Sequence, residues 1–125
     1  MLFAIALGGA AGTLARFGLG AYAQRFSGTF PFSTLAINVL GSFLFGFFMR
    51  YSLATTVSPE LRVGLTIGFC GAFTTFSTFS YETVRLLEQG SYARAGAYVT
   101  ASVVLSILAT FAGFAAARGV LAPSS

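Results

Sequence analysis

The stretch Gly68-Phe-Cys-Gly-Ala-Phe-Thr-Thr-Phe-Ser-Thr-Phe-Ser80 decides how this 125-residue chain folds. It places two glycines and five hydroxyl side chains in the middle of a long segment of low charge, where contact with lipid would favour Leu and Val. A spanning helix can break at membrane depth only inside protein or beside water, where side chains satisfy the freed backbone groups. The sequence therefore predicts a membrane-spanning helix with a discontinuity near residues 71–75.

Charge is too sparse in the rest of the chain for a water-soluble domain. Charged residues make up 8% of the sequence and hydrophobic residues 56%, whereas a soluble domain is roughly a quarter charged. The uncharged stretches are residues 1–15, 26–49, 63–81 and 95–117. A bilayer core requires about 20 mainly apolar residues per helix, and the first stretch reaches this only if Arg16 lies inside the span. We predict an all-α integral membrane protein, one domain over residues 1–125, with helices at 2–23, 32–54, 61–89 and 93–118.

Composition also excludes most enzyme chemistry. The chain has no His, no Asp and one Cys, Cys70, so it cannot supply a Ser-His-Asp or Cys-His arrangement or an ordinary zinc site. We therefore expect that it is not an enzyme. Its net charge of +4 comes from arginines that mostly mark helix ends, where they can reach lipid phosphates. The expected environment is membrane lipid, with no nucleic-acid partner.

The arginines are almost evenly divided between the two ends of the predicted bundle. With four alternating helices, one end holds three arginines and the other holds three, or four if Arg16 is counted there. The two sets are Arg50, Arg62 and Arg118 against Arg25, Arg85 and Arg94. Because arginine bias normally fixes orientation, this balance predicts insertion both ways and an antiparallel homodimer. The alternative is that the N-terminal charges set a single orientation.

Polar side chains recur at helical spacing in three of the spans. Asn38 is flanked by Thr34 and Ser42, and is either an interhelical hydrogen bond or part of a polar pathway. Phe76 and Phe79 lie among the hydroxyls beyond the predicted break, where the positive ring edges can face an anion. The last span carries hydroxyls at four-residue steps, at Tyr98, Ser102, Ser106 and Thr110. Neutral donors and ring edges of this kind predict a path for a small anion, and backbone carbonyls exposed at the break predict a cation site.

Small residues predict close helix packing at two further places. Gly8 and Gly12 form a small-xxx-small pair in the first span, and Gly64 and Gly68 form a second pair in the third span. Such pairs let helix backbones approach each other in lipid.

Three motifs in this chain closely resemble the Fluc (CrcB-type) fluoride channels of bacteria. They are the Thr-Thr-Phe-Ser-Thr-Phe core of residues 68–80, the stretch Thr-Leu-Ala-Ile-Asn-Val-Leu-Gly at 34–41, and Gly-Gly-Ala-Ala-Gly-Thr-Leu-Ala-Arg at 8–16. The resemblance covers essentially the whole chain. It implies a fluoride-selective channel in the inner or plasma membrane that exports fluoride passively and protects the cell from it. It also implies an antiparallel homodimer with two pores and a structural Na⁺ between the subunits.

Particular residues follow from this resemblance. The pore phenylalanines would be Phe76 and Phe79, and the pore amide would be Asn38. The family's polar track would fall on Tyr98, Ser102, Ser106 and Thr110. The sodium ligands would be the backbone carbonyls of Gly71 and Thr74 from both subunits. One departure is Ala72, where many members of the family have a second glycine.

Two other functions compete with this interpretation. A small multidrug antiporter also has four helices, but that family requires an acid in its first helix, and here the only deep acid is Glu82 in the third span. The other rival is a structural subunit that transports nothing, which would conduct no ion as purified protein. The chain also lacks an ATP-binding loop, which favours a channel over a pump.

Overall fold

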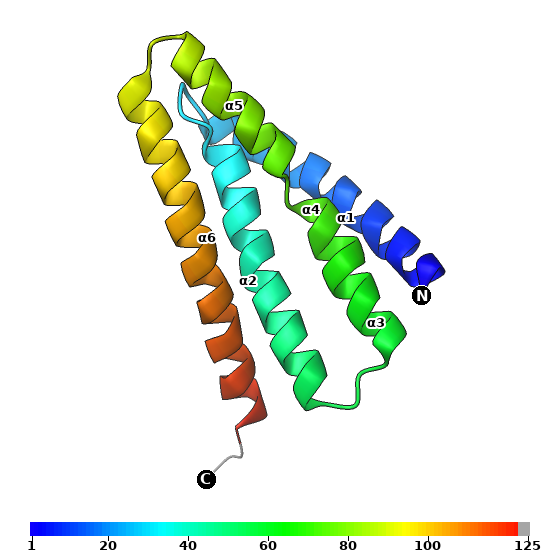
Figure 1. Ribbon diagram of the computed structural model, residues 1–125. Coiled ribbons are helices and arrows are strands. Elements are labelled where there is room, and N and C mark those ends of the chain that lie inside the picture. Colours follow the sequence, from blue (N-terminus) through cyan, green and yellow to red (C-terminus); the bar gives the residue numbers. More distant parts are fainter. Residues whose placement is uncertain (123–125) are drawn as a thin grey trace.

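The structure is a computed structural model that describes residues 1–122. Its four helical segments are long and apolar enough to cross a membrane, and the described residues contain no strand (Figure 1). They are Leu2–Phe26, Phe32–Ala54, Pro59–Glu88 and Tyr92–Leu121. The predicted all-α, four-span membrane fold is confirmed.

Three spans begin and end at or close to the residues that the sequence predicted. Helix α1 (Leu2–Ala23) continues into a 3₁₀ turn, η1 (Gln24–Phe26), and helix α2 covers Phe32–Ala54, so both helices have the predicted bounds. Helix α6 (Tyr92–Leu121) continues three residues beyond Arg118, where the sequence predicted its end. A cation in the last turn complements the negative end of the helix dipole, so Arg118 lies inside the helix instead of ending it.

The third span is divided into four pieces, and the chain leaves the helix at the centre of the molecule. Thr74 (ψ 155°) and Thr75 (φ −146°, ψ 105°) are extended, which confirms the predicted break. The seven residues before Gly71 form a π-helical turn, which the sequence did not predict. The pieces are α3 (Pro59–Val63), η2 (Gly64–Cys70), α4 (Gly71–Phe73) and α5 (Phe76–Glu88).

A glycine ends α5 and returns the chain to the last span. Gly90 has φ 75°, a conformation that costs little only for glycine. The N–H of Ser91 then reaches the carbonyl of Leu86 (2.9 Å), and the N–H of Gly90 reaches that of Leu87 (3.0 Å). This hydrogen-bonded ending satisfies carbonyls that the last turn would leave free, and α6 can begin at Tyr92.

The two predicted glycine pairs pack against each other and join α1 to the third span. A Cβ on Gly8 would overlap the carbonyl of Gly64, and a Cβ on Gly68 would lie 2.8 Å from the carbonyl oxygen of Ile5. A Cβ on Gly12 would overlap the carbonyl of Phe69. The backbones are therefore in direct contact, as the small-residue pattern predicted.

Helices α2 and α6 meet in the same way on the other side of the molecule. A Cβ on Gly113 would overlap the carbonyl of Phe43, and one on Gly46 would lie 2.5 Å from the carbonyl oxygen of Thr110. This contact fixes the depth at which the hydroxyls of α6 face α2.

The bundle has two distinct ends. The N-terminus, the end of α6 at Leu121 and the loop 55–58 lie at one end, and the loops 27–31 and 89–91 lie at the other (Figure 1). The arginines therefore divide between the ends as the sequence count assumed. Arg16 is within α1, at the depth of the break, because its Nε donates to the carbonyl of Ala72 (3.0 Å).

Candidate ion pathway

Asn38 of α2 holds the break with both halves of its amide. Its Nδ2 donates to the carbonyl oxygen of Thr75 (3.2 Å), and its Oδ1 accepts from the N–H of Thr75 (2.7 Å). Asn38 thus forms interhelical hydrogen bonds, which is the first of the two roles that the sequence left open for it. Its side chain also borders a cavity, so the second alternative is compatible with the same geometry.

Two carbonyls at the break accept side-chain donors from other helices. The carbonyl of Ala72, which the break separates from its helical donor, receives the Nε of Arg16, and the carbonyl of Thr75, the N-cap residue of α5, receives the amide of Asn38. A carbonyl without a partner at this depth would be costly, because no water is available in hydrocarbon. These two contacts allow the helix to stop in the middle of the membrane.

Two other carbonyls lose the donor that a continuous helix would provide. The helical partner of the Gly71 carbonyl is the N–H of Thr75, which donates to Asn38 instead. The helical partner of the Thr74 carbonyl is the N–H of Thr78, which donates to the side chain of Thr75 (3.2 Å). Gly71 and Thr74 are the two residues at which the family resemblance implies sodium ligands.

Gly71 is not needed for the bend itself. It is helical (φ −62°, ψ −36°), and a Cβ there would meet only the carbonyl oxygen of Thr66, at 3.8 Å. The backbone leaves the helix at Thr74 and Thr75, so the alanine at Ala72 does not affect the break either. Nothing within one subunit requires a glycine at position 71.

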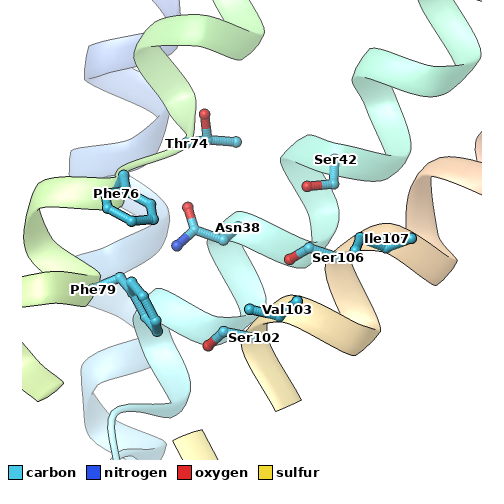
Figure 2. A pocket seen from close by; sticks show the side chains of 9 residues that line it. All are labelled: Asn38, Ser42, Thr74, Phe76, Phe79, Ser102, Val103, Ser106 and Ile107. Atoms are coloured by element: carbon cyan, nitrogen blue, oxygen red, sulfur yellow. The ribbon is translucent and has the colours of Figure 1, made fainter. Parts of the chain in front are cut away.

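A cavity of about 310 Å³ lies between α2, the break and α6, and Figure 2 shows its lining. Five of the seven predicted pore residues line it: Asn38, Phe76, Phe79, Ser102 and Ser106. The other lining residues are Ser42, Thr74, Val103 and Ile107. The lining contains no charged side chain, only an amide, hydroxyls, aromatic rings and aliphatic groups.

The other two predicted pore residues, Tyr98 and Thr110, do not line this cavity but contact residues that do. The fully buried ring of Tyr98 packs against Phe79, with centroids 5.2 Å apart. Thr110 Oγ1 donates to the carbonyl of Ser106 (3.1 Å) and to that of Ser42 (3.4 Å). The four hydroxyl residues of α6 thus follow one ridge, with the middle two at the cavity.

One buried hydroxyl on this ridge, Ser102 Oγ, has no hydrogen-bond partner among the described residues. Tyr98 Oη is also buried, but it lies beside the side chains of Glu82 and Thr34. Buried polar atoms are nearly always paired, so an unpaired one calls for an explanation such as a bound water or ion. The unpaired hydroxyl of Ser102 belongs to the cavity lining.

The two predicted pore phenylalanines differ in their surroundings. Phe76 and Phe79 contact each other with centroids 5.5 Å apart and planes at 53°. Phe79 is also held by Tyr98, whereas Phe76 is 79% exposed. Phe79 is therefore fixed by contacts within the chain, whereas Phe76 lies at the molecular surface.

A polar contact beyond the rings involves Glu82, the only deep acid. Thr34 Oγ1 donates to Glu82 Oε1 (2.5 Å) and joins α2 to α5. Glu82 also lines a second cavity, of about 290 Å³, together with Arg85 and residues of the loop 27–31. The sequence predicted neither this contact, nor the hydrogen bond from Arg16 to the break, nor Ser42 in the cavity lining. The four-residue spacing of Thr34, Asn38 and Ser42 on one helix face was the signal that could have indicated Thr34 and Ser42 as site residues.

Comparison with known proteins gives a consistent result. The family described as "CrcB-like protein, Camphor Resistance (CrcB)" matches residues 3–114. The chain is 53% identical over 119 residues to a protein of Geobacter metallireducens, covering 94% of this chain and 96% of that protein. It is 47% identical over 122 residues to a protein of Sorangium cellulosum, covering 96% of each chain. It is 49% identical over 111 residues to one of Thermus thermophilus, covering 88% of this chain and 87% of that protein. All three relatives are named fluoride-specific ion channel FluC.

Proposed function

We propose, from the premise that this chain belongs to the CrcB-like protein family, that it is a fluoride-specific ion channel of the cell membrane. Fluoride enters a cell in acidic surroundings as neutral hydrogen fluoride, which then releases its proton inside. A passive channel lets the anion leave down its gradient. The protein is a channel and not an enzyme, and fluoride is its cargo.

The observation that carries this function is the cavity at the helix break, whose uncharged lining combines an amide and hydroxyls with aromatic and aliphatic groups. Fluoride is small and strongly hydrated, so a pore must replace its water with several donors placed along the path. The amide of Asn38, the hydroxyls of Ser102 and Ser106 and the edges of Phe76 and Phe79 are such donors. An arginine at the same place would hold the ion too tightly for rapid passage.

We infer that the pathway is completed by a second, antiparallel copy of the chain. Only 6% of the apolar window of α1 is buried within one subunit, against 28% for α2. Phe76 is exposed although it borders a polar cavity, and a cavity lined by hydroxyls is a poor surface for lipid chains. A second subunit would cover both.

We also infer a structural Na⁺ at the dimer centre. The carbonyls of Gly71 and Thr74 have lost their helical donors, and carbonyl oxygens suit a hard cation. Gly71 is exposed and has open space above it, so a side chain is disfavoured there only if something outside the subunit approaches. When bound, the cation would balance the partial negative charge of these carbonyl oxygens and hold the helix breaks of the two subunits together.

Fluoride efflux from liposomes containing the purified protein tests the channel function. A fluoride electrode should record rapid release once a potassium ionophore removes the opposing voltage. Chloride efflux from the same liposomes should remain near that of protein-free liposomes. Absence of fluoride release would favour the structural-subunit alternative, and equal chloride release would contradict fluoride specificity.

The antiparallel dimer and its cation require a separate measurement. A crystal structure of the protein grown in sodium should show two inverted subunits, with density on their two-fold axis within reach of both Gly71 carbonyls. A parallel pair, or helix breaks that do not meet, would contradict this assembly without affecting fluoride selectivity.

A further inference from the structure

A third cavity lies between the ends of α2 and α6. These two helix ends are at the end of the bundle that also carries the loop 55–58 (Figure 1). The volume of the cavity is about 320 Å³. Two arginines and four apolar residues line it: Arg50, Leu53, Ala54, Arg118, Leu121 and Ala122. No acidic residue among residues 1–122 contributes to the lining.

This cavity is separate from the ion pathway. Arg118 is twelve residues beyond Ser106 on the same helix, which corresponds to about 18 Å along the axis. Helices α2 and α6 both end beside it, at Ala54 and Leu121, which places the cavity where the bilayer core meets the headgroups. Neither arginine is needed for the proposed fluoride path.

An apolar strip of α6 leads from the middle of the bilayer to Arg118. Val104, Leu108 and Phe111 are 48%, 56% and 64% exposed, and Arg118 follows Phe111 by seven residues on the same helix face. At about 100° per residue, this strip lies opposite the ridge of Ser102 and Ser106. It therefore faces away from the pathway and is available to a lipid chain.

We propose that this cavity binds the headgroup phosphate of an anionic phospholipid, with an acyl chain along the apolar strip. A guanidinium group can donate two parallel hydrogen bonds to two oxygens of one phosphate. Arg50 and Arg118 come from two different helices and border the same cavity. Basic pockets between transmembrane helices have the charge and position that anionic headgroups require.

The backbone does not help to hold an anion here. Both α2 and α6 end at this cavity, and the C-terminal end of a helix carries partial negative charge. The attraction must therefore come from the two guanidinium groups, and it is lost when they are removed. The general attraction of any terminal arginine to lipid phosphates is therefore the alternative that the experiment has to separate from a built site.

Native mass spectrometry of the purified channel tests the proposal. The protein is equilibrated in micelles that contain equal amounts of phosphatidylglycerol and phosphatidylcholine, and the lipids that remain bound are counted. The wild type should retain phosphatidylglycerol over phosphatidylcholine by about threefold or more. The double variant Arg50→Gln, Arg118→Gln should bind the two lipids about equally.

Two controls separate the cavity from net charge. The double variant Arg25→Gln, Arg94→Gln removes the same charge at the other end of the bundle and should keep the preference. The variant Ala54→Phe keeps every charge but fills the cavity, and should reduce the preference. Glycerol phosphate, which has the headgroup charge without acyl chains, should not displace the lipid.

Four results would overturn the proposal. They are equal retention of both lipids by the wild type, an equal loss of preference in the two arginine pairs, an unchanged preference in Ala54→Phe, and displacement of the lipid by glycerol phosphate. The last result would assign the cavity to free phosphate.

Discussion

Phe79 is fixed by contacts within its own subunit, whereas its neighbour Phe76 is not. Phe79 packs on Tyr98, which is fully buried, and Phe76 packs on Phe79 with its outer face exposed. A ring that is held in place beside a polar cavity can present its positive edge to an anion at a defined point. The two rings line the same cavity but differ in how they are held, because Phe79 is fixed within the chain and Phe76 lies at its surface.

Replacing either ring with an aliphatic side chain should block fluoride. Phe79→Ile and Phe76→Ile keep the segment apolar but remove the ring edge, so efflux should fall by about tenfold or more. Phe47→Ile is the control, because Phe47 stacks on Tyr51 away from the cavity, and its efflux should change little. Fluoride-electrode recordings on liposomes measure all three, with gel filtration to verify dimer formation. Near-normal efflux in the Phe76→Ile, Phe79→Ile double variant would place the pathway elsewhere.

Asn38→Asp should abolish fluoride efflux for two separate reasons. The carboxylate places a negative charge beside the pathway, which repels an anion, and it loses the donor to the carbonyl of Thr75. A protonated Asp regains a donor and loses its charge, so efflux should recover in part as the pH falls. Leu40→Ala, on the exposed side of α2, is the control. Efflux from Asn38→Asp at the wild-type rate at neutral pH would show that position 38 does not border the path.

At the scale of elements, the sequence predicted the break but not how it is held. The glycines and hydroxyls of residues 68–80 indicated that a helix would stop there, because hydroxyl side chains can satisfy backbone groups that a break frees inside protein. The structure places the break at Thr74 and Thr75 and leaves Gly71 helical. The hydrogen bonds between Asn38 and Thr75 join residues that are 37 apart in the sequence. Helical periodicity carries no information about such a contact.

The helix ends and the packing glycines were easier to predict from the sequence than the contacts at the break. The sequence predicted the bounds of α1 and α2 correctly, although Arg16 lies inside α1 and Arg50 lies inside α2. The π-helical turn at Gly64–Cys70 was not predicted, because it depends on how α1 packs against that turn. Patterns along one helix therefore predicted the spans, whereas contacts between helices determined the site.

The contact between α1 and the third span predicts a sharp difference between two neighbouring glycines. In Gly8→Ala the new methyl group would overlap the backbone carbonyl of Gly64, and backbone cannot move aside as a side chain can. The loss of stability should be about 1–3 kcal/mol or more. In Gly9→Ala the nearest atom is a carbonyl oxygen 3.9 Å away, so stability should change by less than about 0.5 kcal/mol. Thermal unfolding in detergent compares the two, and equal stability would contradict the packing of Gly8 on Gly64.

For the whole molecule, the surfaces that the single chain leaves exposed are those that the proposed second copy would cover. The apolar window of α1 is almost entirely unburied, and the cavity beside Phe76 opens on the subunit surface. A second copy in the opposite orientation would place the two helix breaks at the same depth, because each break lies near the middle of its span. A parallel copy would also match the breaks in depth, so the direction of insertion has to be decided by the charges at the two ends.

Both orientations should therefore occur in one membrane. The loops are short and carry nearly equal numbers of arginines at the two ends of the bundle, so neither end is favoured to stay inside the cell. Reporters fused to the C-terminus should be detected on both sides. Two lysines inserted after Ala122 should bias insertion one way and lower fluoride efflux, because one partner of each antiparallel pair becomes scarce. Two lysines inserted after Gly28, in the loop at the opposite end, should bias insertion the other way. Coexpression of the two biased variants should then restore efflux, because each supplies the orientation that the other lacks.

Two results would show that a single orientation is sufficient. They are a wild-type reporter found on one side of the membrane only, and biased variants that are fully active alone.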